Sequence, residues 1–260
     1  MISVLICSYN AERFITDTIV SVLSQTYRDI EILILDNCST DKTRQILKEF
    51  QTKDNRITIF FGKDNMGPYA GLNYLLDKAK GEFIAINDHD DIWYPEKLDK
   101  QVQFLKKNEK YVGCGSAIIN WYEKYNTYFY RSHPKNADVA WHTSLLFKNN
   151  GYRYDLTKKV ATDFYFIKNI LSQNTKKIYN FPEPFVLRRV FKESNNLSGK
   201  WMKSISFLEI LILNVGFIDK LTILFRKIFP KEFIELIVNR FWKNNIPKIY
   251  QIYVSAYKIS

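Results

Sequence analysis

The chain has 260 residues, of which 46% are apolar, 25% charged and 16% aromatic. This length predicts one large domain with an appendage or two domains, and the composition excludes a chain that is disordered over most of its length. The formal net charge of +11 suits an anionic partner, either nucleic acid, an anionic membrane or a phosphorylated ligand, and charge alone does not choose among them.

The N-terminal stretch MISVLICSYN predicts a first buried strand, because it has no basic leader and its apolar run is too short for a signal peptide. The three cysteines, Cys7, Cys38 and Cys114, form no CxxC pair of the kind that binds zinc or carries a redox disulfide. We therefore expect free thiols in a reducing, cytoplasmic location.

Short apolar runs alternate with amphipathic stretches over the first 107 residues. Strands are predicted at 2–7, 30–35, 57–61 and 82–87, and helices at 11–25, 40–51, 68–80 and 95–107. Buried strands separated by helices predict a mainly parallel α/β sheet with helices on both faces.

Local signals mark three of the predicted helices. Ser39 or Thr40 can cap the second helix, and Pro95 suits the first turn of the fourth. Gly81 can end the third helix before the fourth strand begins.

Polar residues follow each of the four predicted strands. These residues are Ser8, Tyr9, Asn10, Asp36, Asn37, Asn65 and Asp88 to Asp91. Because ligands of open α/β sheets lie beyond the carboxyl ends of the strands, we expect the four loops to converge on one crevice.

The chain from about 110 to 190 is less regular. Short aromatic strands are predicted in YVGCGSAIINWYEKYNTYFY and in WHTSLLF, and a helix in ATDFYFIKNILSQ. We expect this half to build the acceptor side of the crevice.

Three aspartates, Asp88, Asp90 and Asp91, stand within four positions. Clustered carboxylates repel one another, and a hard divalent ion, Mg²⁺ or Mn²⁺, shared with the phosphates of a substrate would relieve this repulsion. The spacing of an EF-hand is absent. An acidic turn favoured by the dipole of the helix after Pro95 explains the cluster about as well, so the residues alone leave both interpretations open.

Four segments resemble a family 2 glycosyltransferase of the GT-A fold, of the bacterial cell-surface polysaccharide and lipooligosaccharide type. They are ICSYN, LDNCSTDKT, NMG followed by GLNYLLDKAKGEFIAINDHDD, and ATDFYFIKNIL. The resemblance covers most of residues 1 to 190. It implies a Rossmann-like, mainly parallel mixed sheet in a catalytic domain over 1–195, and leaves 196–260 as a basic amphipathic helical extension.

The resemblance also implies roles for single residues. Tyr9 would lie against the base, with Asp36 and Asn37 near it. The D-x-D element would place Asp88 at the ribose or the metal and Asp90 on the metal, which is Mn²⁺ or Mg²⁺. The remaining residues that we expect around the nucleotide sugar are Ser8, Asn10, Asn65, Asn73 and one basic residue, Arg188 or Arg189, with Arg189 preferred.

Asp163 matches the carboxylate that serves as catalytic base in this family. Thr162 replaces the glutamate that commonly precedes it, Asn37 replaces a second aspartate, Cys38 replaces a glycine, and the usual arginine near 70–73 is absent. The change at Asn37 weakens the inference of uridine over another base.

Plain structural roles compete with several of these assignments. Tyr9 could be a strand-end aromatic residue, and Asp163 could be a helix cap. The histidines are scattered, and we give none of them a role: His89, His133 and His142.

The last segment, 201–260, carries nine lysines and arginines against four acidic residues, a net charge of +5. Charged residues interrupt its apolar runs, so a membrane span is not expected. Basic amphipathic helices suit the surface of an anionic membrane, which would place the protein at the inner face of the cell membrane. Packing on the catalytic domain, or on a second subunit in a homodimer, explains the pattern equally well.

These observations favour an inverting, metal-dependent glycosyltransferase that moves a sugar from a nucleotide-diphosphate donor, expected to be a UDP-sugar, to a hydroxyl of a glycan or glycolipid. A nucleotidyltransferase is the first alternative, but the Gly-rich basic loop that binds triphosphate is absent after the first strand. The second alternative is a non-catalytic module that binds membranes or nucleic acid. No nucleic-acid-binding motif is recognisable, and no nucleic acid partner is expected.

Overall fold

The computed structural model describes residues 1–123, 127–158, 161–173 and 177–191. The described residues up to Arg189 belong to one compact unit, Met1–Arg189. The predicted helical extension over 196–260 lies outside the described residues, so it and its boundary stay predictions. In the part of the chain that the structure describes, no helix combines the length and the apolar character that crossing a bilayer requires.

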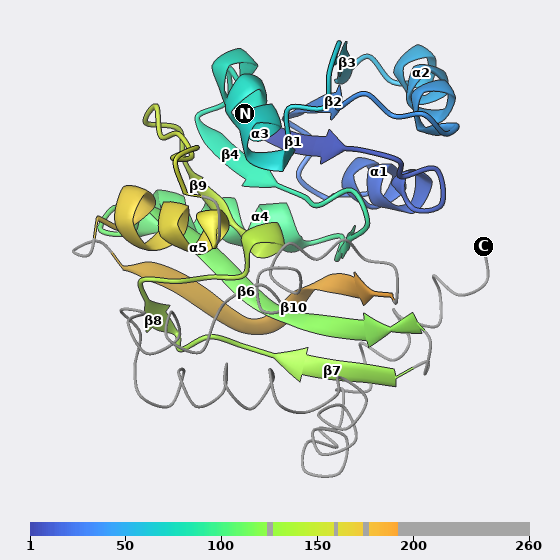
Figure 1. Ribbon diagram of the computed structural model, residues 1–260. Coiled ribbons are helices and arrows are strands. Elements are labelled where there is room, and N and C mark those ends of the chain that lie inside the picture. The colour runs from blue at the N-terminus through green and yellow to red at the C-terminus, as the bar shows by residue number, and fades with distance from the viewer. Residues whose placement is uncertain (124–126, 159–160, 174–176, 192–260) are drawn as a thin grey trace, which may run out of the picture. The chain divides into compact units, whose positions relative to one another are not determined.

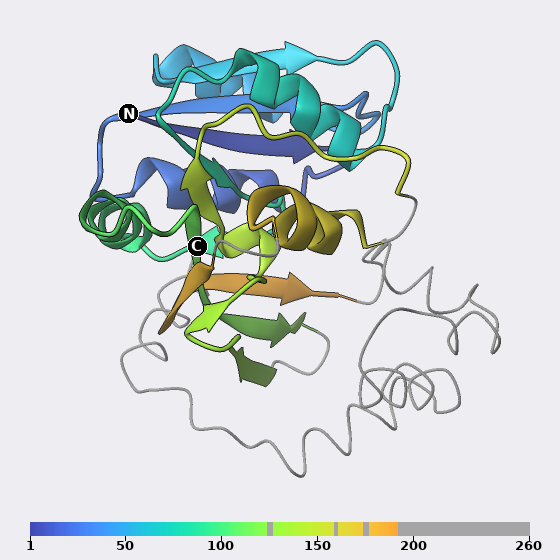
Figure 2. The ribbon, with the colours of Figure 1, turned by 90° about the vertical axis from the view of Figure 1, so that its left-hand side faces the viewer.

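The described residues form one mixed sheet with the order β3-β2-β1-β4-β9-β6-β10-β5, to which β7 is added beside β6 and β8 beside β10. Figure 2 shows β3, β2 and β1 side by side in this order. The strands are β1 (Ile2–Ser8), β2 (Ile30–Asp36), β3 (Ile57–Phe61), β4 (Phe83–Ile86), β5 (Ile92–Trp93), β6 (Gly113–Tyr122), β7 (Thr127–Arg131), β8 (Asn136–Ala137), β9 (Leu146–Lys148) and β10 (Ile178–Val190).

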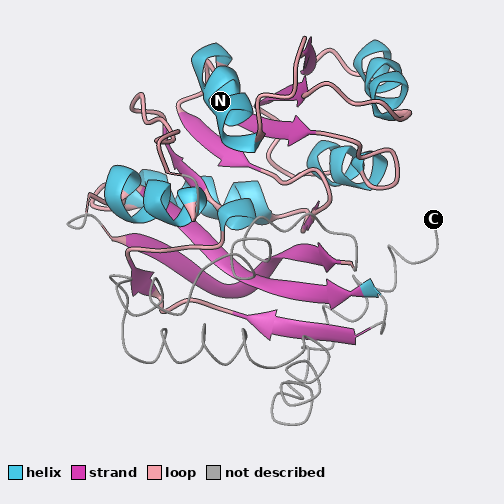
Figure 3. Ribbon diagram, in the orientation of Figure 1, coloured by secondary structure: helices cyan, strands magenta, loops and turns pink. Residues whose placement is uncertain are grey.

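The helices alternate with the strands of the first half, as Figure 3 shows. They are α1 (Ile15–Leu23), α2 (Thr43–Lys53), α3 (Pro68–Lys78), α4 (Lys97–Lys107) and α5 (Thr162–Tyr165), with the 3₁₀-helix η2 (His142–Ser144) and the π-helix η3 (Phe166–Leu171). Strand β1 pairs in parallel with β2 and β4, and β2 pairs in parallel with β3. The predicted fold class, an α/β sheet with flanking helices, is confirmed as a mixed sheet. The predicted parallel pairing is limited to β3, β2, β1 and β4, whereas β9 pairs antiparallel with β4 and β6, β7 with β6, and β5 and β8 with β10.

The central strands are buried on both faces because their side chains alternate between two layers of helices (Figure 1). Val4 and Ile6 of β1 belong to a core shared with α1, α2 and α4. Leu5, between them, belongs to a core shared with α3 and the helical segment 162–171. A buried aliphatic side chain of this size contributes about 1.5–3 kcal/mol, so these continuous apolar strands fix the layered arrangement.

Helix α1 is shorter than the predicted helix over 11–25. Residues 11–14 form a turn instead, because this segment is tied to the loop before α2. The N–H of Ala11 donates to Thr43 Oγ1 at 2.7 Å, and the N–H of Glu12 donates to Asp41 Oδ2 at 3.1 Å.

The predicted caps of α2, Ser39 and Thr40, are wrong. The helix begins at Thr43, whose N–H donates to Asp41 Oδ1 at 2.9 Å. Ser39 Oγ accepts the N–H of Asn10 at 3.0 Å, so its side chain joins two loops.

Two further boundary residues have other roles than predicted. Pro95 lies in the turn before α4, which begins at Lys97. Helix α3 ends at Lys78, before Gly81. A Cβ at Gly81 would lie 2.5 Å from the main-chain nitrogen of Ser3, so the glycine permits close packing on β1.

The second half contains the aromatic strands and the helix that the sequence predicts there. β6, β7 and β9 form in the two aromatic segments, and α5 with η3 covers most of 161–173. A π-helix is rare and often lies at a functional site, and this one directly follows the helix that carries Asp163.

Candidate active site

The loops that follow β1, β2 and β4 are held together at the carboxyl edge of the parallel strands. The N–H of Asn37 donates to the carbonyl of Ser8 at 2.8 Å. The ring of His89, in the loop after β4, approaches the carbonyl of Cys7 at 3.3 Å. The structure therefore brings together the loops that the sequence places at the ends of these strands.

The three polar residues after β1 differ in what they offer to a ligand. Ser8 is fully buried, and its hydroxyl donates to the Leu35 carbonyl. Asn10 Oδ1 accepts the N–H of Thr40 at 2.9 Å, so its amide joins the loop before α2. Tyr9 has 40% of its surface exposed, and it is therefore the side chain that this loop presents for stacking against a planar group.

Asp36, at the end of β2, is fully buried and its carboxylate is already paired. Oδ2 accepts hydrogen bonds from Arg44, whose Nε and Nη2 both lie 2.9 Å away, and Oδ1 accepts the N–H of Ser39 at 3.3 Å. The guanidinium of Arg44 is also stacked 5.0 Å from the ring centroid of Phe61. Asp36 therefore anchors Arg44 at the edge of the predicted nucleotide site.

Asn37 organises the turn after β3. Its Nδ2 donates to Asn65 Oδ1 at 3.0 Å and to the Gly67 carbonyl at 3.2 Å, and its Oδ1 accepts the N–H of Met66 at 3.1 Å. Asn65 Oδ1 in turn accepts the N–H of Gly67 at 2.9 Å. Asn37 is 2% exposed, so these internal bonds engage both the donor and the acceptor of the amide that the resemblance places near the base.

The acidic loop after β4 presents its carboxylates to different degrees. Asp88 keeps 44% of its side chain exposed, and Asp90 is partly buried. Asp91 is 1% exposed, and its Oδ1 accepts the main-chain N–H of Arg189 at 3.1 Å. Asp88 and Asp90 are therefore the carboxylates available to a ligand, whereas Asp91 supports the loop from behind.

Burial and neighbouring negative charge raise the pKa values of two carboxylates in this loop. Burial raises the pKa of Asp90, and the charge of Asp88 raises it further. Burial, followed by the charges of Asp90 and Asp88, raises the pKa of Asp91 well above its ordinary value. A cation bound at this loop would oppose these shifts, because it favours the ionised carboxylates.

The donor set fits a divalent ion that is shared with a ligand. Within the described residues, no group of three His, Cys, Asp or Glu side chains is close enough to hold a metal alone. Asp88 and Asp90 supply hard oxygen ligands, and Mg²⁺ and similar ions are commonly held by one or two carboxylates together with substrate phosphates. The residues present thus fit Mn²⁺ or Mg²⁺ completed by a diphosphate.

His142 and Tyr154 join this site, and the sequence interpretation missed both. His142 Nδ1 lies 3.3 Å from Asp88 Oδ1, and His142 Nε2 lies 2.8 Å from the hydroxyl of Tyr154. Burial lowers the pKa of His142, but the hydrogen bond to Asp88 and the charge of that carboxylate outweigh it and raise the pKa. The only signal in the sequence was a polar histidine just before a buried strand, in WHTSLLF.

Asn73, expected near the nucleotide, pairs with this region instead. Its Nδ2 donates to the Tyr154 carbonyl at 2.9 Å, and its Oδ1 accepts the Tyr154 N–H at 2.8 Å. Both polar groups of the amide are thus bonded to one residue of the loop before α5.

Asp163 lies in the first turn of α5. Its charge, together with burial, raises the pKa of Tyr69 and of Tyr154, and it also acts on His142. The charge of Asp88 also raises the pKa of the same two tyrosines and of His142. Asp163 and Asp88 therefore both act electrostatically on one cluster formed by Tyr69, Tyr154 and His142.

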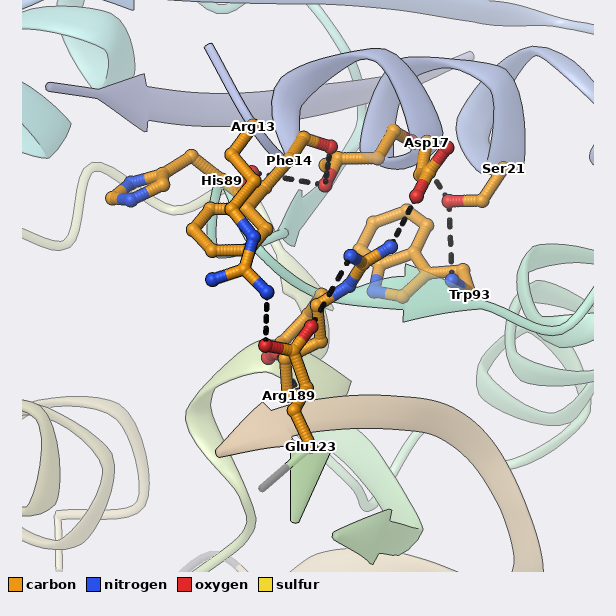
Figure 4. Close-up of polar contacts among 10 residues, drawn as sticks. Arg13, Phe14, Asp17, Ser21, His89, Trp93, Glu123 and Arg189 are labelled. Carbon is orange, nitrogen blue, oxygen red and sulfur yellow. Dashed lines mark hydrogen bonds and ion pairs between the residues drawn. The ribbon is translucent and has the colours of Figure 1, made fainter. Parts of the chain in front are cut away.

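The two arginines at the end of β10 point to different partners. Figure 4 shows the Arg189 side chain directed at Asp17 of α1, with Glu123 beside it. Arg189 is 9% exposed, so its guanidinium is committed to this buried ion cluster. The charge of Arg188, by contrast, lowers the pKa of Asp88, of Asp90 and of Asp91. Of the two, Arg188 is the arginine whose charge reaches the acidic loop.

A curated relative is 41% identical to this chain over 108 residues, which is 42% of this chain and 42% of the relative. It is the UDP-Glc:alpha-D-GlcNAc-diphosphoundecaprenol beta-1,3-glucosyltransferase WfgD of Escherichia coli. The chain spans about two fifths of the length of the first curated relatives that it matches.

Two solved structures share the fold. TarS 1-349 of S. aureus in complex with UDP has a TM-score of 0.60 and 21% identity, and the match covers 87% of this chain and 70% of TarS. The mannosyltransferase PcManGT of Pyrobaculum calidifontis, in complex with GDP-Man and Mn²⁺, has a TM-score of 0.61 and 16% identity over 77% of this chain and 59% of its own. At these identities, the likeness concerns the fold alone.

The family model described as "Glycosyl transferase family 2" matches residues 3–192, which takes in every strand of the sheet and all the loops of the site. The resemblance in the four quoted segments is confirmed: the chain belongs to glycosyl transferase family 2.

Proposed function

We propose that the protein transfers a sugar from a nucleotide-diphosphate donor to a hydroxyl of a cell-surface glycan or glycolipid, with inversion at the anomeric carbon. The observation that carries this proposal is that Asp88, which contacts His142, and Asp163 both act by their charge on His142 and Tyr154. One carboxylate at the donor diphosphate and another at the acceptor hydroxyl are what such a transfer requires.

Asp163 acts as the base in this proposal. It accepts the proton of the acceptor hydroxyl while that oxygen forms its bond to the anomeric carbon and the bond from this carbon to the diphosphate oxygen breaks. Attack from the face opposite the leaving group inverts the anomeric centre. Positive charge develops on the sugar during the reaction, as in other glycosyl chemistry.

Asp88 and Asp90 would hold Mn²⁺ or Mg²⁺, which when bound neutralises charge on the departing diphosphate. Arg188 adds a positive charge that already acts on these carboxylates. The complex of PcManGT with GDP-Man and Mn²⁺, a protein of the same fold, supports the use of a divalent ion.

The base of the nucleotide would stack on exposed Tyr9. A uridine nucleotide is the first to test, because TarS was crystallised with UDP and WfgD is named for UDP-Glc. Since the amide of Asn37 is engaged within the protein and also takes up the N–H of Met66, we expect recognition of the base to fall to Tyr9.

The acceptor belongs to cell-surface polysaccharide synthesis in this proposal, in line with the diphosphoundecaprenol acceptor in the name of WfgD. Such an acceptor would place the enzyme at the inner face of the cell membrane. The three cysteines are free, which suits a reducing cytoplasm. A homodimer stays a prediction.

A thermal-shift panel tests the proposal. UDP, GDP, CMP, dTDP and their sugars are each added with and without Mn²⁺ to the wild type, to Asp90→Ala and to Asp29→Ala. Asp29 is 65% exposed and bonded to the N-terminus, so it controls for the loss of a surface carboxylate. We expect one nucleotide to raise the melting temperature only when both Mn²⁺ and Asp90 are present.

If no nucleotide stabilises the wild type under any metal condition, the transferase proposal fails. A non-catalytic membrane or nucleic-acid binding module then becomes the better explanation of the positive charge. UTP and GTP are added to the same panel, and stabilisation by either in preference to the sugar nucleotides would instead favour a nucleotidyltransferase.

A further inference from the structure

A continuous path of side chains connects α3 to the acidic loop. Asn73 of α3 bonds to both main-chain polar groups of Tyr154, at 2.8 and 2.9 Å. The Tyr154 hydroxyl meets His142 Nε2 at 2.8 Å, and His142 Nδ1 meets Asp88 Oδ1 at 3.3 Å. This path joins four segments that are distant in the sequence and ends on a carboxylate of the D-x-D element.

Within this path Tyr154 is tightly packed, whereas Asp88 at its end is exposed to solvent. Tyr154 is 3% exposed and is stacked on Phe166 of η3, with 4.0 Å between ring centroids. His142 keeps 12% of its side chain exposed, and Asp88 keeps 44%. The last member of the path is therefore the one that a ligand from solvent can reach.

The hydrogen-bonding chemistry of this path determines which oxygen of Asp88 is free to bind a ligand. A carboxylate can only accept hydrogen bonds, so His142 donates from Nδ1 and uses Oδ1 of Asp88. Oδ2 stays available for a cation or a ribose hydroxyl. A hydrogen-bonded histidine thereby fixes the rotation of the Asp88 carboxylate, and Tyr154 fixes the rotation of the imidazole.

We propose that His142 and Tyr154 are positioning residues for Asp88, which set the direction of its free oxygen toward the metal and diphosphate. Asn73 holds Tyr154 in place for this task. The inference rests on the proposed function, because it assumes that Asp88 binds the metal-diphosphate group. Outer hydrogen-bonding partners of metal ligands typically change metal affinity by about 10–100-fold when removed.

Two substitutions separate positioning from packing. Tyr154→Phe keeps the ring on Phe166 and removes only the hydroxyl. His142→Asn keeps an amide nitrogen near the position of Nδ1, so it can still donate to Asp88, whereas His142→Ala cannot. Tyr111→Phe is the matched control, because Tyr111 is 8% exposed and its hydroxyl donates to Asn136 at 2.7 Å outside the site.

The measurement is the affinity for Mn²⁺ in the presence of saturating UDP, or of the nucleoside diphosphate that the thermal panel selects. The paramagnetic resonance signal of free Mn²⁺ reports how much of the ion is bound. We expect Tyr154→Phe and His142→Ala to weaken binding about 10-fold. His142→Asn should retain more affinity than His142→Ala, and Tyr111→Phe should bind as the wild type does. Melting temperatures of the unliganded variants show that each one folds.

The outcomes distinguish this inference from the proposal on which it rests. If Asp88→Ala and Asp90→Ala abolish Mn²⁺ binding but Tyr154→Phe and His142→Ala match Tyr111→Phe, the positioning role is overturned and the proposed function stands. If the wild type binds no Mn²⁺ with any nucleotide, or if the aspartate variants bind it normally, both are overturned.

Discussion

At the scale of single residues, Asp163 and Asp88 have separable tasks, which gives the first prediction. Asp163→Asn keeps the size of the side chain but cannot accept a proton, so turnover should fall by about 10²–10⁴-fold. Nucleotide and Mn²⁺ binding should stay unchanged, because the ligands of the donor diphosphate are intact. The rate of donor consumption with acceptor and the thermal shift with nucleotide measure the two effects.

Asp138→Asn is the control for this prediction, since Asp138 is 44% exposed and pairs with Lys168 at 3.4 Å. A wild-type rate for Asp163→Asn would show that another group accepts the proton. A loss of nucleotide binding in this variant would instead place Asp163 at the donor.

Lys97 gives a second prediction at the residue scale, on stability. It is fully buried, its Nζ lies 3.9 Å from the ring centroid of Trp93, and it donates to Gln101 at 2.8 Å. Burial lowers the pKa of Lys97 to about 7. Between that pH and the ordinary lysine pKa of about 10.4, the unfolded chain binds a proton that the folded chain does not, so stability rises with pH.

We therefore expect the free energy of unfolding of the wild type, relative to Lys97→Met, to increase by about 3 kcal/mol from pH 7 to pH 9.5. Urea unfolding at several pH values measures this difference. Lys106→Met, at an exposed lysine of the same helix, should show no such trend. A difference between wild type and Lys97→Met that is independent of pH would mean that Lys97 stays charged in the folded protein.

At the scale of elements, the strands and helices of the first half follow from the sequence because each is specified by its own apolar pattern. The ends of the helices are less predictable, because Ser39 bonds to Asn10 in another loop, and Asp41 bonds to Glu12 as well as to Thr43 of its own helix. The hydrogen bonds of side chains in the site depend on contacts between segments that are distant in the sequence. Asn37 meets Asn65 28 residues away, and His142 meets Asp88 54 residues away, so no local pattern reveals either pair.

The packing of α3 on the sheet gives a prediction at this scale. A Cβ at Gly71 would lie 2.5 Å from Cys7 Sγ and 3.0 Å from Leu35 Cδ2. Gly71→Ala should improve the helix propensity of α3 by about 1 kcal/mol, but overpacking costs typically 1–3 kcal/mol, so a net loss of stability of up to about 2 kcal/mol is expected. Urea unfolding measures the net change.

The pair Gly71→Ala and Cys7→Ala provides the control as a double-mutant cycle. Removing Sγ makes room for the new methyl group, so the double variant should be more stable than the sum of the single effects predicts. Additive effects would show that α3 moves away from β1 to accommodate the methyl group.

At the scale of the whole molecule, the charge is unevenly placed, since 201–260 alone contributes +5 of the +11. This segment lies outside the described residues, so its role is a prediction from the sequence. If it docks on an anionic membrane, the protein should sediment with phosphatidylglycerol vesicles at low salt, and the bound fraction should fall as salt screens the attraction. Neutral phosphatidylcholine vesicles should bind it weakly.

Matched charge reversals show whether vesicle binding depends on the segment 201–260 or on the net charge of the molecule. One variant replaces Arg226, Lys227, Lys231 and Lys243 with Glu, and the other replaces four exposed lysines of the catalytic unit, Lys78, Lys106, Lys107 and Lys110. Both variants have the same net charge, so attraction by the whole molecule would weaken equally in the two. Docking through 201–260 predicts that only the first variant loses the vesicles. If the wild type does not bind vesicles at all, packing on the catalytic unit or on a second subunit explains the basic amphipathic pattern instead.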